Sequence, residues 1–308
     1  MVVFPNAKVN LGLSVLRKRN DGFHDIETVM IPIGLYDVLE IIVAETENTK
    51  MYVSGIDIRT HGNYYEPPAI QKKENSLISG LVMGSESKSL SLRMLSGEDL
   101  KQNLVMKVYE LLKKDFGLPS VYIHLHKAIP VGAGLGGGSS DAAFAIKLFN
   151  ELFELGLTDV KQMNYASVTG SDCAFFIRNT PAIATGRGEI LSPLNLNLND
   201  LFIYVVKPDF SVNTGYAYSL TKPIETGMSF NDIVKMPLED WKNNLKNDFE
   251  KPVFGIYPEL SAIKNKLYAS GAVYAAMSGS GPAVFGIFKN LPEAIDFPSE
   301  YFQWTGKL

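Results

Sequence analysis

The sequence has a single cysteine, Cys173, so the chain cannot form a disulfide within itself. This is typical of proteins from a reducing compartment. No run of apolar residues approaches the roughly 20 that a membrane-spanning helix needs. The first residues, Met-Val-Val-Phe-Pro, lack both the positive charge and the apolar stretch of a secretory signal. These absences predict a cytoplasmic protein that does not enter a membrane.

The sequence also has little excess of either sign of charge. The formal net charge is −4 over 308 residues, and the basic residues form no long run, which argues against a nucleic-acid-binding surface. Hydrophobic residues make up 46% of the chain and charged residues 20%, which is ordinary for a globular protein of one large domain or two. Nothing in the sequence indicates an obligate protein partner.

Glycine, by contrast, is concentrated in one place. Five of the nine residues from Gly132 to Ser140 are glycine, which lets the backbone adopt positive φ and approach a ligand closely. The apolar residues that follow recur at helical spacing. Ser139 or Ser140 is a good N-cap for this helix, and Asp141 falls in its first turn. Because a helix N-terminus presents unpaired N–H groups to an anion, we interpret residues 129–143 as a phosphate-binding loop.

The residues alone leave other interpretations of this loop open. Gly132, Gly134 and Gly137 fit the dinucleotide pattern G-x-G-x-x-G, but Pro130 separates them from the preceding strand and no acid closes a following one. A Walker A loop needs a lysine before the serine, and none precedes Ser139. A flexible surface turn would explain the glycines but not the capped helix.

The run P-x-G-x-G-L-G-G-G-S-S resembles the phosphate loop of the galactokinase, homoserine kinase, mevalonate kinase and phosphomevalonate kinase superfamily. Its triple glycine is similar to that of one family of this group, the 4-diphosphocytidyl-2-C-methyl-D-erythritol kinases. The resemblance implies that ATP is the cofactor, with Mg²⁺ held by the Ser140 hydroxyl. The residues implied to bind ATP are Pro130, Val131, Gly132, Ala133, Gly134, Leu135, Gly136, Gly137, Gly138, Ser139 and Ser140.

Residues 7–15 alternate between apolar and polar side chains, which predicts a strand. Its apolar face consists of Val9, Leu11, Leu13 and Val15. Lys8 and Asn10 lie on the other face, which either meets water or projects into a site. The stretch is similar to the family motif A-K-[IV]-N-L. This similarity implies that Lys8 lies close to the transferred phosphate and the attacking hydroxyl, and that Asn10 binds the substrate.

Asn20-Asp21-Gly22 predicts a turn, and Phe23 and His24 follow it. Taken alone, His24 would be a surface histidine. The segment is similar to the family's D-G-[YF]-H, with phenylalanine where tyrosine is commoner. The similarity implies that Phe23 stacks on a cytosine ring and that His24 hydrogen-bonds its edge. Tyr218 falls where the family often has a second aromatic residue over the cytosine, and Thr214 is implied to bind substrate beside it.

Asp172 stands directly before five apolar residues, so we expect its carboxylate to be partly desolvated. Such an acid is either the N-cap of a helix or a working group. The segment G-S-D-C-A-F-F is similar to the one that holds the family's catalytic aspartate. It implies that Asp172 accepts or orients the proton of the attacking hydroxyl, while Lys8 keeps it ionised. Asp141 is the competing acid.

Four further segments bear on the resemblance. The resemblance implies that Asn103 and Lys127 flank the adenine. Asn103 opens a predicted helix that reaches about Phe116, and Lys127 follows a predicted strand. The turn from Ser278 to Pro282 is similar to the superfamily's third motif, a glycine loop lying beside the first. Residues 59–98 have no counterpart in the family pattern, and we expect them to form an inserted surface loop.

The resemblance implies an α+β fold of two domains. Residues 1–190 would form an ATP-binding domain like ribosomal protein S5 domain 2, and residues 191–308 a ferredoxin-like substrate-binding domain. The implied activity is ATP-dependent phosphorylation of the C2 hydroxyl of a cytidine diphosphate-linked methylerythritol in the non-mevalonate isoprenoid precursor pathway. Two alternatives stay open: a mevalonate- or homoserine-type kinase, which has no need of Phe23-His24, and a non-catalytic nucleotide-binding sensor, against which Lys8 and Asp172 speak.

Overall fold

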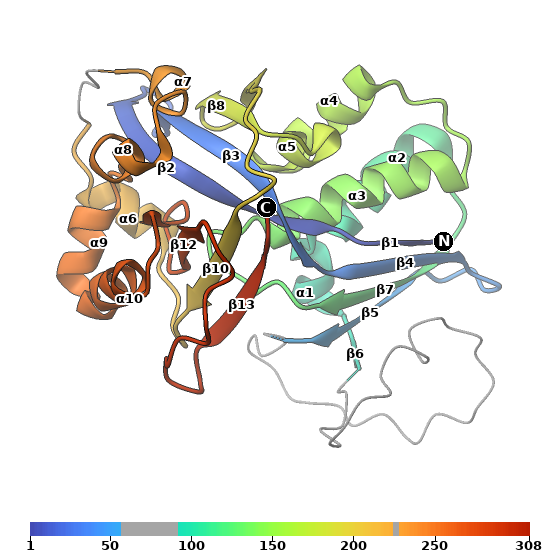
Figure 1. The fold of residues 1–308 in the computed structure, drawn as a ribbon. Helices are drawn as coiled ribbons and strands as arrows, with labels where there is room; N and C mark the ends of the chain where they lie inside the picture. Colours follow the sequence, from blue (N-terminus) through green and yellow to red (C-terminus); the bar gives the residue numbers. More distant parts are fainter. Residues whose placement is uncertain (57–91, 224–227) are drawn as a thin grey trace.

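The computed structural model of the chain describes residues 1–56, 92–223 and 228–308. These residues form three sheets with helices packed against them (Figure 1), which confirms the predicted α+β class. Among the described residues, none of the helices combines the length and the apolar composition that a membrane crossing requires.

The first sheet carries the helices of the N-terminal part of the chain. Its strand order is β1 (Val2–Val3), β4 (Val38–Val43), β7 (Val121–Lys127), β5 (Lys50–Gly55) and β6 (Arg93–Met94). One core cluster joins it to the helices α2 (Leu104–Phe116), α3 (Gly137–Leu152), α4 (Asp159–Thr169) and α5 (Cys173–Arg178). The strand β7 leads directly into the glycine loop and α3, so the loop is fixed at both ends.

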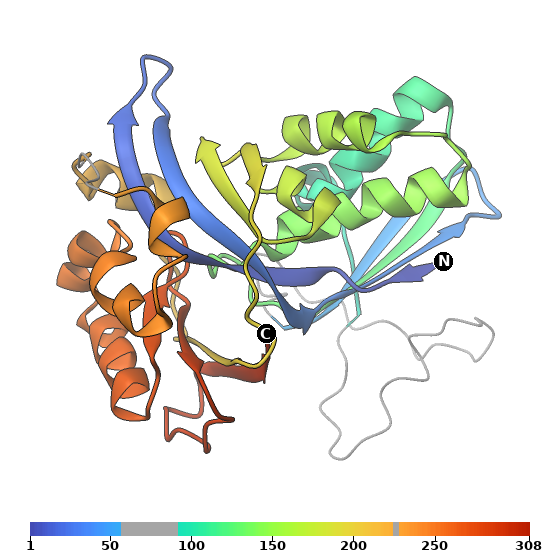
Figure 2. The same ribbon diagram turned by 45° about the horizontal axis from the view of Figure 1, so that its top comes forward.

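The second sheet joins two hairpins by antiparallel pairing of β3 with β8, in the order β2 (Asn6–Lys18), β3 (His24–Tyr36), β8 (Ala182–Gly186) and β9 (Ile190–Pro193). The long strands β2 and β3 pass between the α2–α3 layer and the C-terminal elements (Figure 1). Figure 2 shows the blue tip of their hairpin projecting beyond the sheets. The turn predicted at Asn20-Asp21-Gly22 is confirmed at this tip.

The predicted alternation along β2 is interrupted by a bulge between Leu11 and Leu13. Gly12 has a φ of +69°, and a Cβ there would lie 2.9 Å from Leu245 Cδ1, so only glycine fits this close approach. Leu11 consequently packs in one core cluster and Leu13 in another. Both faces of the strand are covered, which rules out the interpretation of a face open to water.

The third sheet belongs to the C-terminal part, in the order β11 (Tyr274–Met277), β12 (Val284–Phe288), β10 (Phe202–Lys207) and β13 (Phe302–Lys307). The helices of this part are α6 (Thr214–Leu220), α7 (Phe230–Ile233), α8 (Leu238–Asn244), α9 (Glu250–Ile256) and α10 (Pro258–Ala269). A core cluster that includes Val9, Trp241 and Phe285 joins this sheet to β2 and β3. The two halves of the chain therefore meet across the β2–β3 hairpin.

Two predictions about local structure need correction or restriction. The helix α3 begins at Gly137, with Gly136 as its N-cap, rather than at the serines, so Asp141 lies in its second turn. The reason is that Gly136 has a φ of +73° and turns the chain into the helix three or four residues earlier than a cap at Ser139 or Ser140 would. The predicted insertion at 59–98 lies mostly outside the described residues; its last part contains β6 and the start of α1 (Gly97–Gln102).

Candidate active site

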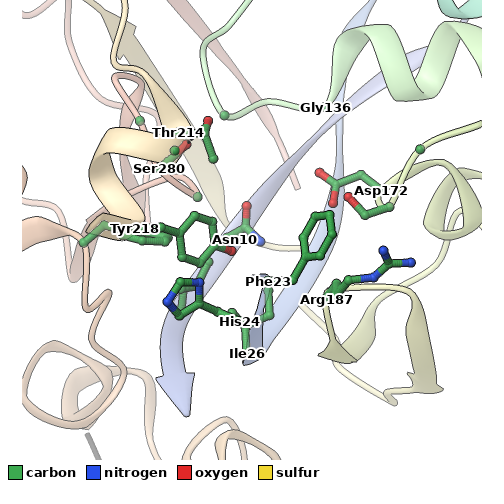
Figure 3. A pocket seen from close by; sticks show the side chains of 18 of the residues that line it. Asn10, Phe23, His24, Ile26, Gly136, Asp172, Arg187, Thr214, Tyr218 and Ser280 are labelled. Atoms are coloured by element: carbon green, nitrogen blue, oxygen red, sulfur yellow. Dashed lines mark hydrogen bonds between the residues drawn. The ribbon is translucent and has the colours of Figure 1, made fainter. Parts of the chain in front are cut away.

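A cavity of about 1070 Å³ lies where the glycine loop, the β2–β3 hairpin and α6 converge (Figure 3). Residues far apart in the sequence share its wall. The cavity brings together ten of the residues predicted for the site, namely Lys8, Asn10, Phe23, His24, Gly132, Gly134, Gly136, Asp172, Thr214 and Tyr218. This grouping gives the cavity a polar end, a glycine-lined edge and an aromatic end.

The polar end is built on an ion pair between Lys8 and Asp172. The distance from Lys8 Nζ to Asp172 Oδ2 is 3.2 Å, and the two side chains are 4% and 29% exposed. Lys8 Nζ also donates to Asn10 Oδ1. Asp172 occupies the N-cap position of α5 but makes no capping hydrogen bond with its side chain. Its carboxylate is therefore available both to Lys8 and to a ligand in the cavity.

Asn10 is fixed by hydrogen bonds on both sides. Its Nδ2 donates to Thr28 Oγ1 at 3.0 Å, and its backbone N–H donates to Ser278 Oγ at 3.2 Å. The backbone N–H of Lys8 donates to Leu135 O at 2.9 Å. These bonds tie β2 to β3 and to both glycine loops, so the Lys8 side chain projects from a rigid strand.

The two glycine loops lie side by side, as the resemblance predicted. Ser278 Oγ donates to Gly134 O at 2.8 Å, and Ala283 N–H donates to Ala133 O at 3.1 Å. Gly134 has a φ of +80°, and a Cβ there would lie 2.1 Å from Ser278 O. Glycine is thus required at this position for the loops to touch.

The N-terminus of α3 opens toward the cavity edge. Its first intrahelical bond is donated by Ser140 N–H to Gly136 O at 2.9 Å. The N–H groups of Gly137, Gly138 and Ser139 come before that bond and have no acceptor within the helix. Gly138 is exposed, and a Cβ there would meet only Leu104 Cδ1, at 3.9 Å. There is room for an anion at these N–H groups.

The rest of the loop lies outside the cavity wall. Ala133, Leu135 and Gly137 are buried, whereas Val131 is 48% exposed. Ser140 is completely buried, and its Oγ has no hydrogen-bond partner among the described residues. Within those same residues there is no group of three or more His, Cys, Asp or Glu side chains that could hold a metal ion.

Two of the predicted ATP-binding residues are occupied elsewhere. Asn103 is the N-cap of α2, and its side chain accepts a hydrogen bond from Val105 N–H at 2.9 Å. Lys127 Nζ forms ion pairs with Asp37 and, at 2.7 Å, with Asp141. Neither Asn103 nor Lys127 lines the cavity.

The acids around Lys127 are buried with it. Asp37 is 0% exposed and Asp141 2% exposed, and burial raises the pKa of Asp141 to about 7. Asp37 Oδ1 accepts the N–H groups of Ala128 and Ile129 at 2.6 and 2.8 Å. The structure thus places Asp141, the competing acid, in a closed cluster behind the loop rather than in the cavity.

At the aromatic end, His24 stacks on Tyr218 with 4.8 Å between ring centroids and 17° between planes. Phe23 lies beside them, 54% exposed, with the guanidinium of Arg187 5.0 Å from its ring centroid (Figure 3). Burial, assisted by the charge of Lys18, lowers the pKa of His24 below 6.5. A lowered pKa favours the neutral imidazole, which offers one donor and one acceptor.

Ser280 and Arg187 are among the wall residues that the sequence analysis did not assign to the site. Ser280 Oγ shares a hydrogen bond of 2.9 Å with Thr214 Oγ1, which joins the second glycine loop to α6. Arg187 reaches the cavity from the hairpin of β8 and β9. In the sequence, Arg187 is a cation between two glycines, a pattern that predicts a turn. Its neighbours in space are needed to show that it lines the cavity.

Comparison with known proteins agrees with this geometry. The GHMP kinases N terminal domain matches residues 103–180, and the GHMP kinases C terminal domain matches residues 232–301. The 4-diphosphocytidyl-2-C-methyl-D-erythritol kinase of Bacteroides fragilis is 45% identical over 94% of this chain and 92% of its own. That of Bacteroides thetaiotaomicron is 42% identical over 100% of both chains.

Solved structures agree as well. The crystal structure of a 4-(cytidine 5'-diphospho)-2C-methyl-D-erythritol kinase is 29% identical and superposes with a TM-score of 0.68, covering 93% of this chain and 89% of its own. The mevalonate kinase of Methanococcus jannaschii superposes with a TM-score of 0.60 at 12% identity, covering 94% and 90%, which shows a shared fold. The chain therefore belongs to the GHMP kinases and, within them, to the family of the 4-diphosphocytidyl-2-C-methyl-D-erythritol kinases.

Proposed function

We propose that the chain transfers the γ-phosphoryl group of ATP to the C2 hydroxyl of 4-diphosphocytidyl-2-C-methyl-D-erythritol, a step of the non-mevalonate route to isoprenoid precursors. The observation that carries this proposal is the Lys8–Asp172 pair, which stands in one cavity with a glycine-lined edge and an aromatic end. The relatives with 41–45% identity bear the name of this kinase, which favours it over a mevalonate or homoserine kinase.

Asp172 and Lys8 have complementary roles in the proposed step. The Asp172 carboxylate accepts or orients the proton of the attacking hydroxyl, and its 29% exposure leaves it open to a ligand. Lys8, 3.2 Å away, pairs with the Asp172 carboxylate and holds it in place. The same ammonium offsets negative charge on the phosphoryl group as the bond to ADP breaks and the bond to the hydroxyl forms.

The ATP phosphates would bind the free N–H groups of Gly137, Gly138 and Ser139 at the start of α3. The adenine would lie beyond the glycine loop, on the side of Asn103 and Lys127. Because both side chains already have partners in the protein, they would stabilise the part of the protein next to the adenine.

Mg²⁺ fits this arrangement as an ion bound mainly by phosphate oxygens and water, since it commonly takes only one or two protein ligands in such sites. The Ser140 hydroxyl is the side-chain oxygen that would hold it, because this atom is buried and lacks a partner among the described residues. When bound, the ion would neutralise charge on the β- and γ-phosphates.

The cytidine end would lie at His24 and Tyr218, with Phe23 beside them. A flat base can stack on such rings, and the neutral imidazole of His24 can bond to its edge. Thr214 and Tyr218 come from residues 191–308, whereas the glycine loop comes from residues 1–190. In this proposal the first domain binds ATP and the second closes over the substrate.

The test is an acceptor comparison. The purified chain is incubated with ATP and Mg²⁺ and, in parallel, with 4-diphosphocytidyl-2-C-methyl-D-erythritol, mevalonate or homoserine, and the products are identified by ³¹P NMR. We expect a new phosphomonoester signal with the cytidylated alcohol alone. Comparable transfer to mevalonate or homoserine would contradict the proposed substrate, and binding of ATP without any transfer would indicate a sensor.

A further inference from the structure

Arg187 stands at the tip of the β8–β9 hairpin, in a turn that holds it rigidly. Gly186 and Gly188 on either side have φ values of +68° and +108°, which side chains other than glycine rarely adopt. The carboxylate of Glu189 accepts the Arg187 backbone N–H at 2.6 Å, and its Oε1 lies 3.6 Å from Arg187 Nε. The side chain is thus anchored at its base, on the Nε side.

The guanidinium of Arg187 lies next to the side chain of Phe23, which also lines the cavity. Its carbon lies 5.0 Å from the centroid of the Phe23 ring (Figure 3), a distance within the range of a cation–π contact. No described residue accepts a hydrogen bond from its Nη groups. Since the side chain is 40% exposed, these groups remain accessible to a ligand.

The charges of the wall favour an anion. The strong bases among the lining residues are Lys8, Lys18 and Arg187, whereas Asp172 is the one acid among them, although the chain as a whole carries −4. Lys8 pairs with Asp172. Arg187 pairs through Nε with Glu189, and its charge also acts on Asp21, while Lys18 acts on His24. The wall therefore offers an anion the Nη donors of Arg187 and the charge of Lys18.

Arg187 lies near groups from both ends of the site. Its guanidinium contacts Phe23, which belongs to the aromatic end. A Cβ on the next residue, Gly188, would lie 3.7 Å from Asp172 Oδ1. A ligand that places a base at His24 and a hydroxyl at Asp172 would therefore extend past Phe23, the residue that this guanidinium contacts.

We propose that Arg187 binds the diphosphate of the substrate and so selects for a nucleoside diphosphate ester. This inference rests on the proposed function, in which the diphosphate joins the cytidine to the reacting alcohol. The planar guanidinium can give two parallel hydrogen bonds to phosphate oxygens, which a lysine cannot do. The diphosphate would then fix the distance between the stacked base and the hydroxyl at Asp172.

The test compares Arg187→Gln and Arg187→Lys with the matched control Arg178→Gln, because Arg178 is exposed and does not line the cavity. KM is measured for each substrate, and cytidine and CDP are compared as competitive inhibitors. We expect Arg187→Gln to raise KM for the cytidylated substrate about tenfold or more, Arg187→Lys to raise it less, and KM for ATP to stay within about twofold. The preference for CDP over cytidine should fall by a similar factor.

The outcomes separate a diphosphate contact from other roles. If Arg187→Gln leaves KM and the preference for CDP unchanged, the proposal is wrong. If it weakens cytidine and CDP equally, Arg187 acts by supporting the Phe23 ring, which also overturns the proposal. Absence of transfer by the wild-type chain would instead contradict the proposed function, so the two failures are distinguishable.

Discussion

Two lysines of this protein are almost equally buried, yet their surroundings differ. Lys8 is 3% exposed and Lys127 6% exposed. Lys8 meets one carboxylate, that of Asp172, which reaches the cavity. Lys127 lies between Asp37 and Asp141, which are both buried. The first ammonium can exchange partners with a ligand, whereas the second is enclosed by the protein.

The enclosed cluster has a mechanical role that follows from its connections. Asp37 accepts the backbone N–H groups of Ala128 and Ile129, at the start of the glycine loop. Asp141 lies on α3, beyond the loop's other end. Lys127 links the two acids and thereby ties both ends of the loop together. The comparison teaches that burial alone does not mark a working lysine; the access of its partner does.

The largest expected effect on stability is at the enclosed lysine. Lys127→Met leaves the carboxylates of Asp37 and Asp141 buried together without a cation, so we expect the free energy of unfolding to fall by about 3–5 kcal/mol. Urea denaturation followed by circular dichroism measures this. The double variant Lys127→Met/Asp141→Asn should recover part of the loss, because an amide, unlike the carboxyl group of Asp141, needs no proton to be neutral beside Asp37. A loss below about 1 kcal/mol would refute the role given to this cluster.

At Lys8 we expect the main effect on kcat rather than on the free energy of unfolding. Lys8→Met should lower kcat by about 10²-fold, the loss typical of a removed charge-stabilising group. Its effect on the free energy of unfolding should be smaller than that of Lys127→Met, because Asp172 can reach water when its partner is lost. Steady-state kinetics and urea denaturation of both variants give the comparison. A kcat close to wild type in Lys8→Met would remove the distinction between the two lysines.

A tenfold effect is expected at the aromatic end. Phe23→Ala or Tyr218→Ala should raise KM for the cytidylated substrate by roughly tenfold or more, since each base stack contributes about 1–3 kcal/mol in nucleic-acid binders. KM for ATP should barely change, because the glycine loop lies elsewhere on the wall. Both constants are measured in each variant. If KM for ATP rises instead, the two nucleotides have been assigned to the wrong ends of the cavity.

The smallest effect is expected for thiol modification at Cys173, next to the reaction centre. Cys173 follows Asp172 but is 0% exposed, and burial raises the pKa of its thiol to about 12. A raised pKa favours the neutral thiol, so at pH 8 only about one molecule in ten thousand carries a thiolate. Ellman's reagent should therefore not react with the native chain at pH 8, whereas the chain unfolded in urea should release one equivalent of thionitrobenzoate. Rapid reaction of the native chain would show that the reagent reaches Cys173, and so that the apolar residues following Asp172 are accessible to solvent.

Contiguous segments of the sequence carried the resemblance from which the candidate site was predicted. The glycine loop, the strand of Lys8 and the polar residue before an apolar run at Asp172 are all contiguous signals. The contacts of Lys127 could not be predicted in this way, because Asp37 is 90 residues distant in the sequence. The start of α3 was also missed, since three successive glycines carry no side-chain signal and the positive φ of Gly136 decides where the helix begins.

Arg187 shows the same limit at the scale of the whole fold. Between Gly186 and Gly188 it is a turn residue by every local criterion. It becomes part of the site because β8 pairs with β3 and brings this turn to Phe23. Such residues are determined by strand pairing, which a single sequence does not reveal.

The central claim is that Asp172 handles the proton of the attacking hydroxyl. Its most direct test is single-turnover transfer of the γ-phosphoryl group to 4-diphosphocytidyl-2-C-methyl-D-erythritol by wild type and Asp172→Asn, with the Kd of ATP measured for both. We expect the transfer rate to fall by about 10² or more in the variant, the contribution of a positioned base, with an unchanged Kd for ATP. Transfer at the wild-type rate would contradict the claim and assign the proton to another group.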